Sequence, residues 1–216
     1  MITRRGFFKT ALKGLSGAAL FFSPLYTLMQ KGFAGAKKIV LPKNTRMASL
    51  INKDPANLDT RNLEITSLAE FDTMGLSDFE IDPGNWRLHV EGEVDNPLGL
   101  TYRDVMSLPS VEREVLLICP GYFALHGRWQ GVDMHHLLKR AECRAKASRV
   151  SFSGPPGKLS KSEQFPIAEV DTGRVFVAYG VNGQKLPQKH GFPLRLVAED
   201  HYGYRWVKYV DRMTVS

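Results

Sequence analysis

A run of five apolar residues, Val115 to Cys119, constrains this chain more than any other segment. The run is short, contains β-branched residues and ends at Pro120-Gly121, which predicts a strand with both faces buried. Such a strand, followed by a sharp turn, fixes its last side chain, the Cys119 thiol, at the rim of a sheet. The alternative is an inert core cysteine, because free cysteine is among the most buried residue types.

Capping residues and the helical spacing of apolar residues predict two short helices. Thr101-x-x-Asp104 is a capping box, and the helix that it begins must end before Pro109. Asp133 caps the other helix, in which apolar positions repeat at i, i+3, i+4 and i+7. The apolar face of that second helix comprises Met134, Leu137, Leu138 and Ala141.

Short strands account for much of the remaining sequence. Apolar and polar residues alternate over 86–91, which predicts a half-buried strand. Later strands are expected at 149–153, 174–179, 192–198 and 206–215, with Asn182-Gly183 as a turn between the second and third of these. These elements predict a single α+β domain with mixed β-sheets and short helices, formed by a turn-rich N-terminal arm over 37–85 and a core over 86–216.

The first 36 residues have the order of a secretory signal. Arg4-Arg5 begins a charged region, an apolar segment runs from Gly14 to Phe22, and Ala34-Gly35-Ala36 is a small-residue cleavage site. The paired arginines indicate the twin-arginine route, with the twin-arginine translocase as a partner and the periplasm as the destination. An uncleaved membrane tether is the alternative, although a spanning helix needs about 20 apolar residues and this run is shorter.

Removal of the signal changes what the charge of the chain implies. The formal charge is +7, but five of the 29 basic residues and none of the 22 acidic ones lie in residues 1–36. The other 24 basic residues, set against 22 acidic ones, give a charge of about +2. A nearly balanced domain does not indicate a nucleic-acid partner.

The motifs of several other protein classes are absent from the sequence. Neither C-x-x-C nor H-E-x-x-H occurs to predict a zinc site, and no G-x-G-x-x-G, P-loop or G-x-S-x-G follows a strand. His135 and His136 are adjacent on a predicted helix and point about 100° apart, so they cannot share one ion. A disulfide between Cys119 and Cys143 is an alternative in an exported protein. The different surroundings of the two cysteines argue against this disulfide, because Cys119 ends a buried apolar run, whereas Cys143 ends a helix among charged residues.

Two cationic residues stand where the C-terminal strands should be apolar. Arg195 shares its strand face with Pro193 and Val197, and Lys208 lies in the last predicted strand. A buried guanidinium is unfavourable unless an anion meets it. A phosphate-bearing cofactor is a natural partner, since arginine offers a fork of two donors and lysine a point charge. Two solvent-facing strand cations are the alternative.

These segments together resemble the sulfite-oxidase superfamily of molybdopterin-dependent oxidoreductases. In this chain, W-R-L-x-V from Trp86 and L-T-Y-x-D-V from Leu100 are similar to the opening of that domain. The segment from Trp129 is similar to the family's W-x-G-V motif. Its close is similar to L-P-Q-K-H-G-F-P-L-R-L-V from Leu186 and Y-G-Y-x-W-V-K from Tyr202. The twin-arginine signal resembles that of the exported bacterial branch, which includes periplasmic methionine-sulfoxide reductase catalytic subunits.

The resemblance implies a molybdenum–molybdopterin cofactor with Cys119 as the metal ligand. The residues that would contact the cofactor are Cys119, Gly154, His190, Arg195, Trp206, Val207 and Lys208. Tyr122, His126 and Arg128 are candidates for the rim of the substrate site, where Tyr122 and Arg128 would assist catalysis; loop packing or surface charge is the alternative for each. Arg61-Asn62 is similar to an R-N-H motif in the family's N-terminal arm.

The implied function is transfer of an oxygen atom to or from a small substrate, which is an S-oxide, an N-oxide or a sulfite-like compound. Electrons would be exchanged with a separate membrane-bound or periplasmic cytochrome, since the sequence has no c-type haem motif and no iron–sulfur cysteine set. Residues 120–124 stand where sulfite oxidases carry an arginine-rich loop, which argues against sulfite. The sequence ends at Ser216, so no C-terminal dimerisation domain is expected. A non-catalytic exported binding domain without the metal is the alternative function.

Overall fold

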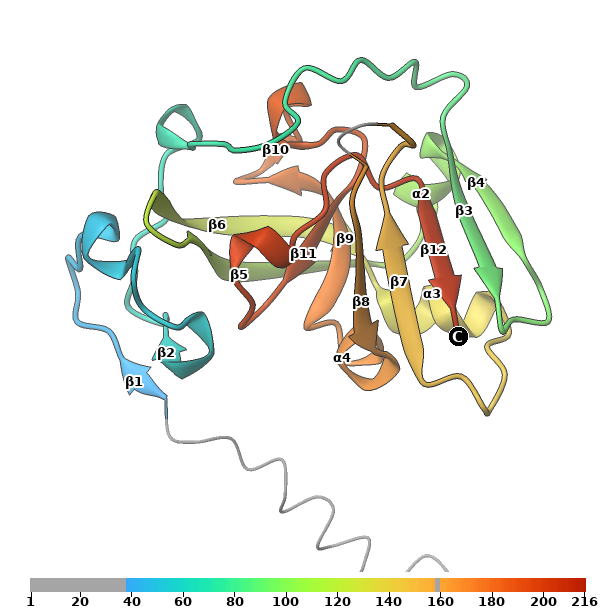
Figure 1. The fold of residues 1–216 in the computed structure, drawn as a ribbon, viewed down its shortest axis with the longest axis horizontal. Helices are drawn as coiled ribbons and strands as arrows, with labels where there is room; N and C mark the ends of the chain where they lie inside the picture. The colour runs from blue at the N-terminus through green and yellow to red at the C-terminus, as the bar shows by residue number, and fades with distance from the viewer. Residues whose placement is uncertain (1–37, 158–159) are drawn as a thin grey trace, which may run out of the picture. The chain divides into compact units, whose positions relative to one another are not determined.

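Two five-stranded β-sheets dominate the fold in the computed structural model, which describes residues 38–157 and 160–216 (Figure 1). One sheet has the strand order β10-β9-β6-β5, with β11 also paired to β9. The other has the order β4-β3-β12-β7-β8, in which β12 runs parallel to β3 and antiparallel to β7. The sheets are therefore mixed and the helices short, which confirms the predicted α+β class.

The first sheet contains β5 (Ser110–Cys119), β6 (Phe123–Val132), β9 (Val175–Val181), β10 (Gln184–Lys185) and β11 (Arg195–Ala198). The second contains β3 (Arg87–Gly92), β4 (Leu98–Thr101), β7 (Arg149–Ser153), β8 (Ser162–Pro166) and β12 (Arg212–Val215). A small parallel pair in the arm is formed by β1 (Ile39–Val40) and β2 (Leu58–Asp59). The α-helices are α2 (Tyr102–Ser107), α3 (Met134–Arg140) and α4 (Ile167–Asp171). Single 3-10 turns are η1 (Met47–Leu50), η2 (Pro55–Asn57), η3 (Leu68–Glu70), η4 (Gln188–His190) and η5 (Gly203–Arg205).

The apolar run predicted to be a doubly buried strand is the end of β5, which pairs with β6 in a long antiparallel hairpin. Val115 and Leu117 pack in the main core. Leu116 and Ile118 pack instead in a second apolar cluster with residues of the N-terminal arm. The arm residues of that cluster are Leu41, Leu50, Leu58 and Leu63. Both faces of the strand are buried, as predicted, because the arm covers the face that the core leaves open.

Both predicted helices are present with their predicted caps. Thr101 and Asp104 form a reciprocal capping box at the start of α2. The Asp133 carboxylate accepts the backbone N–H of His136 at the start of α3. The residues of the predicted apolar face of α3 are all buried: Met134, Leu137, Leu138 and Ala141. Local sequence was sufficient to place these helices.

The two predicted C-terminal strands are shorter than expected. The strand predicted over 192–198 is wrong at its start, since β11 begins only at Arg195, after a cis Phe192-Pro193 bond. Pro193 has no N–H group to donate to a neighbouring strand, which accounts for the later start. The strand predicted over 206–215 is wrong over 206–211. Tyr209 has φ of 56° there, in the left-handed region, which interrupts an extended backbone before β12 begins at Arg212.

The turn predicted at Asn182-Gly183 is present, with φ values of 53° and 72°. It joins β9 to the short β10, so β10 comes before β11 in the chain. The predicted strands at 86–91, 149–153 and 174–179 correspond to β3, β7 and β9. The sequence did not predict β4, β6, β8 or α4.

The signal predicted over residues 1–36 lies outside the described residues. Among the residues that the structure describes, no helix is both long enough and apolar enough to cross a membrane.

Candidate functional site

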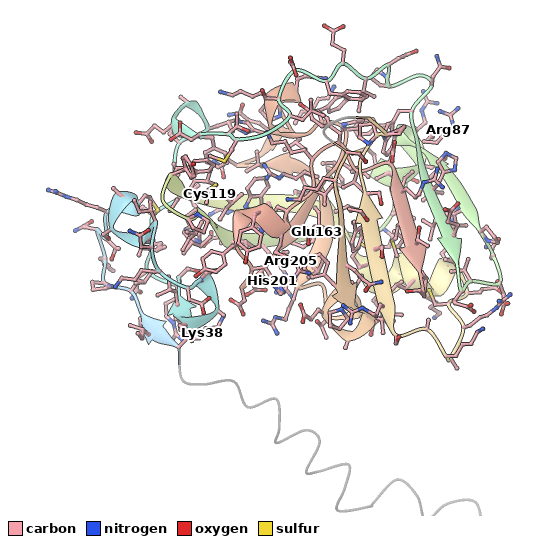
Figure 2. All side chains as sticks on the ribbon, viewed as in Figure 1. Lys38, Arg87, Cys119, Glu163, His201 and Arg205 are labelled. Carbon is pink, nitrogen blue, oxygen red and sulfur yellow. The ribbon has the colours of Figure 1, made fainter. Side chains whose placement is uncertain are left out.

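A cavity of about 280 Å³ opens beside the last residue of β5. Segments that are far apart in sequence form its walls, including residues 72–76 of the arm, the connection after β7 and the segment from η5 to Tyr209. The cavity is lined by five of the residues predicted to hold a cofactor: Cys119, Gly154, Arg195, Trp206 and Lys208. Figure 2 shows Cys119 at the turn end of the β5–β6 hairpin.

Cys119 is half-buried and free of any disulfide. The Tyr122 N–H donates to the Cys119 carbonyl at 3.0 Å, and Gly121 takes a φ of 78°, so the turn fixes the end of the strand. Burial raises the pKa of the Cys119 thiol, and the charge of Lys161 opposes this only in part. Because a metal ion binds cysteine as the thiolate, a bound metal would supply the stabilisation that the protein alone does not. Cys143 is also free, so the structure has no Cys119–Cys143 disulfide.

Arg195 is a buried cation without a complete set of partners. The residue is 6% exposed, and its Nε has no hydrogen-bond partner within the described residues. The guanidinium carbon lies 5.2 Å from the ring centres of both Trp129 and Trp206. Burial lowers the pKa of Arg195 to about 10, so the side chain stays charged at neutral pH. An unsatisfied buried guanidinium beside a cavity favours an anionic ligand.

Lys208 lines the same cavity but is held by oxygen atoms of the protein. Its Nζ donates to the Leu76 carbonyl at 2.8 Å and to the Lys189 carbonyl at 3.0 Å, and also to the Thr73 hydroxyl. Burial, followed by the charge of Arg195, lowers the pKa of Lys208 to about 7. Lys208 therefore ties the arm segment at 73–76 to the core, and an anion in the cavity would favour its charged form.

Three predicted cofactor residues support the wall of the cavity in different ways. His190 is buried near Arg195, and burial, with Arg195 as the next cause, lowers its pKa to about 4, so the ring is neutral at pH 7. Val207 is fully buried, and its carbonyl accepts the Leu196 N–H at 2.7 Å. At Gly154 an added Cβ would lie 2.8 Å from the Lys208 carbonyl, so only glycine permits this approach. Of these three, only Gly154 lines the cavity.

The structure places the predicted rim residues outside the cavity lining. Tyr122 is 69% exposed in the hairpin turn. Arg128 forms an ion pair with Glu114 directly across the β5–β6 hairpin, at 2.9 Å. His126 is buried and lies 3.4 Å from the Glu64 carbonyl.

The Arg61-Asn62 pair also has partners inside the arm. Arg61 pairs with Asp59, and the Asn62 amide donates to the Leu41 carbonyl at 3.1 Å. Both residues lie outside the cavity lining.

Sequence reasoning missed two residues that line the cavity near its thiol. Met74, from the arm, places its Sδ 3.8 Å from the Cys119 Sγ. Lys161, from the connection between β7 and β8, donates to the Trp206 carbonyl at 3.1 Å and to the Tyr204 carbonyl. Both stand in irregular segments, where no periodic pattern indicates which way a side chain points. Their position depends on tertiary contacts that the sequence does not display.

Comparison with known families decides what kind of domain carries this cavity. Residues 75–216 match the family model described as "Oxidoreductase molybdopterin binding domain". The chain belongs to this family. The matched residues include Cys119, Arg195 and Lys208, so most of the cavity lining belongs to the molybdopterin-binding domain, and residues 72–74 of the lining precede the matched range.

Several relatives of this domain family are known by sequence or structure. An uncharacterized oxidoreductase of Bacillus subtilis is 30% identical over 60% of this chain and 64% of its own length. Mitochondrial sulfite oxidase of Rattus norvegicus is 30% identical over 63% of this chain and 30% of the relative. The protein-methionine-sulfoxide reductase catalytic subunit of Campylobacter jejuni is 24% identical over 97% of this chain and 72% of the relative.

A solved structure of the sulfane dehydrogenase SoxCD from Paracoccus pantotrophus shares the fold, with a TM-score of 0.59 and 25% identity. The similarity covers 63% of this chain and 39% of that chain. This chain therefore spans less than two thirds of several relatives that it matches. The comparisons confirm a sulfite-oxidase-type molybdopterin-binding domain, and with it the predicted molybdenum–molybdopterin cofactor.

The residues of the cavity fit such a cofactor. Cys119 offers a thiol, which as the thiolate is a ligand for a transition metal. Arg195 offers a buried fork with an unsatisfied Nε, which suits a phosphate group. A soft metal ligand and an anion-binding cation thus line the same cavity, as a cofactor that carries both a metal and a phosphate requires.

Proposed function

We propose that this chain is a periplasmic enzyme that transfers an oxygen atom to or from a small substrate, with Cys119 as the protein ligand of molybdenum. The observation that carries the proposal is the convergence of the Cys119 thiol and the unsatisfied Arg195 guanidinium on one cavity. A thiol there would be inert without a metal, and a buried cation there lowers stability without an anion.

Each proposed cofactor residue has a distinct task. Arg195 would hold the phosphate with two parallel donors, and Lys208, which borders Gly191 together with Arg195, would add a second charge. Trp129 and Trp206 exclude water from the guanidinium, which strengthens its attraction for an anion. When bound, the cofactor supplies a redox-active metal that exchanges oxygen with the substrate. The protein contributes the thiolate, the anchoring charges and the shape of the cavity.

The wall near Cys119 favours an S-oxide or an N-oxide over sulfite. Leu117, Phe123 and Pro155 give this wall a largely apolar character. The turn over residues 120–124 contains no charged side chain that could bind a dianion. We propose that a separate cytochrome exchanges electrons with the domain, since the sequence has no haem or iron–sulfur motif of its own.

A dye-coupled assay tests this function. Purified protein should oxidise a reduced viologen dye when dimethyl sulfoxide or trimethylamine N-oxide is added, and should oxidise sulfite more slowly with ferricyanide as acceptor. Molybdenum-loaded protein without turnover in either direction would favour the alternative, a non-catalytic binding domain. Sulfite oxidation without oxide reduction would contradict the proposed substrate class.

Export is expected to depend on the paired arginines. The double change Arg4→Lys with Arg5→Lys keeps the charge of the signal but removes the pair that the twin-arginine translocase reads. Unprocessed precursor should then accumulate in the cytoplasm, whereas the wild type should appear in the periplasm with an N-terminus near Lys37. The matched control, Lys9→Arg with Lys13→Arg, should be exported normally. Equal periplasmic amounts of wild type and the first double variant would show that another route is used.

A further inference from the structure

Lys161 is a cation of the cavity that the cofactor contacts proposed above do not use. It stands in the connection between β7 and β8, and its side chain is partly buried in the cavity wall. Its Nζ reaches across to η5, where it donates to the Tyr204 and Trp206 carbonyls. The position of η5 therefore determines which end of the cavity the ammonium group occupies.

The η5 turn packs directly against the strand that ends in Cys119. A Cβ added at Gly203 would lie 3.1 Å from the Leu117 Cδ2 and 3.2 Å from the Ile118 carbonyl oxygen. These two residues immediately precede Cys119 in β5. Lys161 is anchored on the carbonyl of Tyr204, the residue after Gly203. Its ammonium group is thus held at the end of the cavity where the Cys119 thiol lies.

The backbone geometry separates Lys161 from the other two cations of the cavity. Arg195 and Lys208 both border Gly191, because a Cβ added there would lie 3.0 Å from the Lys208 Cβ and 3.2 Å from the Arg195 Cβ. Lys161 enters the cavity from another segment, the connection between β7 and β8, and is anchored on η5 beside the strand that ends in Cys119.

The charge of Lys161 is only partly balanced by its neighbours. An ammonium group has three N–H donors, and two of them are used by the two carbonyls. The nearest carboxylate oxygen, of Glu163, is 4.0 Å away, beyond hydrogen-bond distance. Glu163 is itself paired with Arg205 at 2.7 Å, and Figure 2 shows these two residues beside each other. One N–H donor thus remains available to a ligand, and Glu163 balances the charge of Lys161 only from a distance while it is paired with Arg205.

We propose that Lys161 binds the oxygen atom of the substrate, an S–O or N–O oxygen with full or partial negative charge, beside Cys119. The inference rests on the proposed function and adds a substrate-binding residue to it. The turn over 120–124 offers no charged side chain for this task, and Arg195 and Lys208 are already assigned to the proposed phosphate. The lysine would orient the oxygen while the apolar wall accepts the rest of a small substrate.

Four variants of the molybdenum-loaded protein test the proposal. Lys161→Gln keeps donors for the two carbonyls but removes the charge, Lys161→Arg keeps the charge, and Lys161→Met removes both. Lys139→Met, at an exposed position of α3 outside the cavity, is the matched control. The measurements are KM and kcat for dimethyl sulfoxide, the dissociation constant of sulfate from calorimetry, and molybdenum content.

Loss of a hydrogen bond to a charged group corresponds to about a tenfold or larger change in affinity. Lys161→Gln should therefore raise KM for dimethyl sulfoxide and weaken sulfate binding by about that factor with unchanged molybdenum content. Lys161→Arg should stay within about threefold of wild type. The proposal is overturned if Lys161→Gln has the same KM and the same sulfate affinity as wild type. It is also overturned if Lys161→Met lowers only the stability and the molybdenum content of the protein. In either case, turnover by the wild type would still support the proposed function. Conversely, if the wild type shows no turnover, the sulfate dissociation constants still test the role of Lys161.

Discussion

Arg195→Ala is expected to leave a folded domain that has lost most of its pterin. The wild-type guanidinium is buried against two tryptophans with an unsatisfied Nε, so without an anion its burial is only partly compensated and the cofactor-free domain should fold without it. Toward a phosphate the same group would form charge-assisted hydrogen bonds, each worth about 1.5–3 kcal/mol. Pterin retention should fall by about tenfold or more. Fluorescence of the released, oxidised pterin measures the occupancy, and thermal unfolding followed by circular dichroism measures the stability.

Two further variants make this result specific. Arg195→Lys keeps the charge but loses the planar fork, so pterin occupancy should fall between those of wild type and Arg195→Ala. Arg212→Ala removes an arginine whose partner is Glu91 on the neighbouring strand, and it should retain the pterin. A protein with Arg195→Ala that keeps full occupancy and only melts earlier would mean that this arginine serves the fold.

Cys119→Ser is expected to abolish turnover and the visible thiolate-to-molybdenum absorption. A serine hydroxyl is nearly the same size as the thiol, so packing at the end of β5 should be preserved. At neutral pH the hydroxyl stays protonated and is a poor substitute for a soft thiolate ligand. Molybdenum content should fall sharply, while some pterin should remain through Arg195 and Lys208. Metal analysis, absorption spectra and the viologen assay measure these effects.

Cys143→Ser is the matched control for the ligand cysteine. Cys143 is free, lies in an isolated bridge with Val94 and is outside the cavity lining. This variant should therefore resemble wild type in metal content, turnover and stability. A disulfide between the two cysteines would instead make both substitutions equally destabilising, by about 2–4 kcal/mol.

The parts of the fold that the sequence predicted are those decided by neighbouring residues. The capping box of Thr101 and Asp104 and the cap at Asp133 depend on contacts within one turn, and both are present. The double burial of the end of β5, residues 115–118, followed from the unbroken apolar run there. Strand alternation also placed Arg195 on a buried face, and this placement is confirmed.

The parts that the sequence did not predict depend on contacts between distant segments. Lys161 and Met74 face the cavity only because the β7–β8 connection and the arm fold over it. The segment 206–211 has the composition of a strand, but its backbone bends at Tyr209 and the Lys208 side chain binds the arm. Arg128 has the character of a site residue in sequence, yet a cross-strand glutamate accounts for its charge. A single sequence does not show these partnerships.

The central claim is that this domain holds one molybdenum–molybdopterin cofactor through Cys119. The direct test is the molybdenum and pterin content of the wild-type protein purified from the periplasm, compared with that of Cys119→Ser prepared in parallel. We expect close to one molybdenum and one pterin per wild-type chain, and little molybdenum in the variant. A folded wild-type protein that carries neither, or a Cys119→Ser protein with the same molybdenum content and turnover as wild type, would contradict the claim.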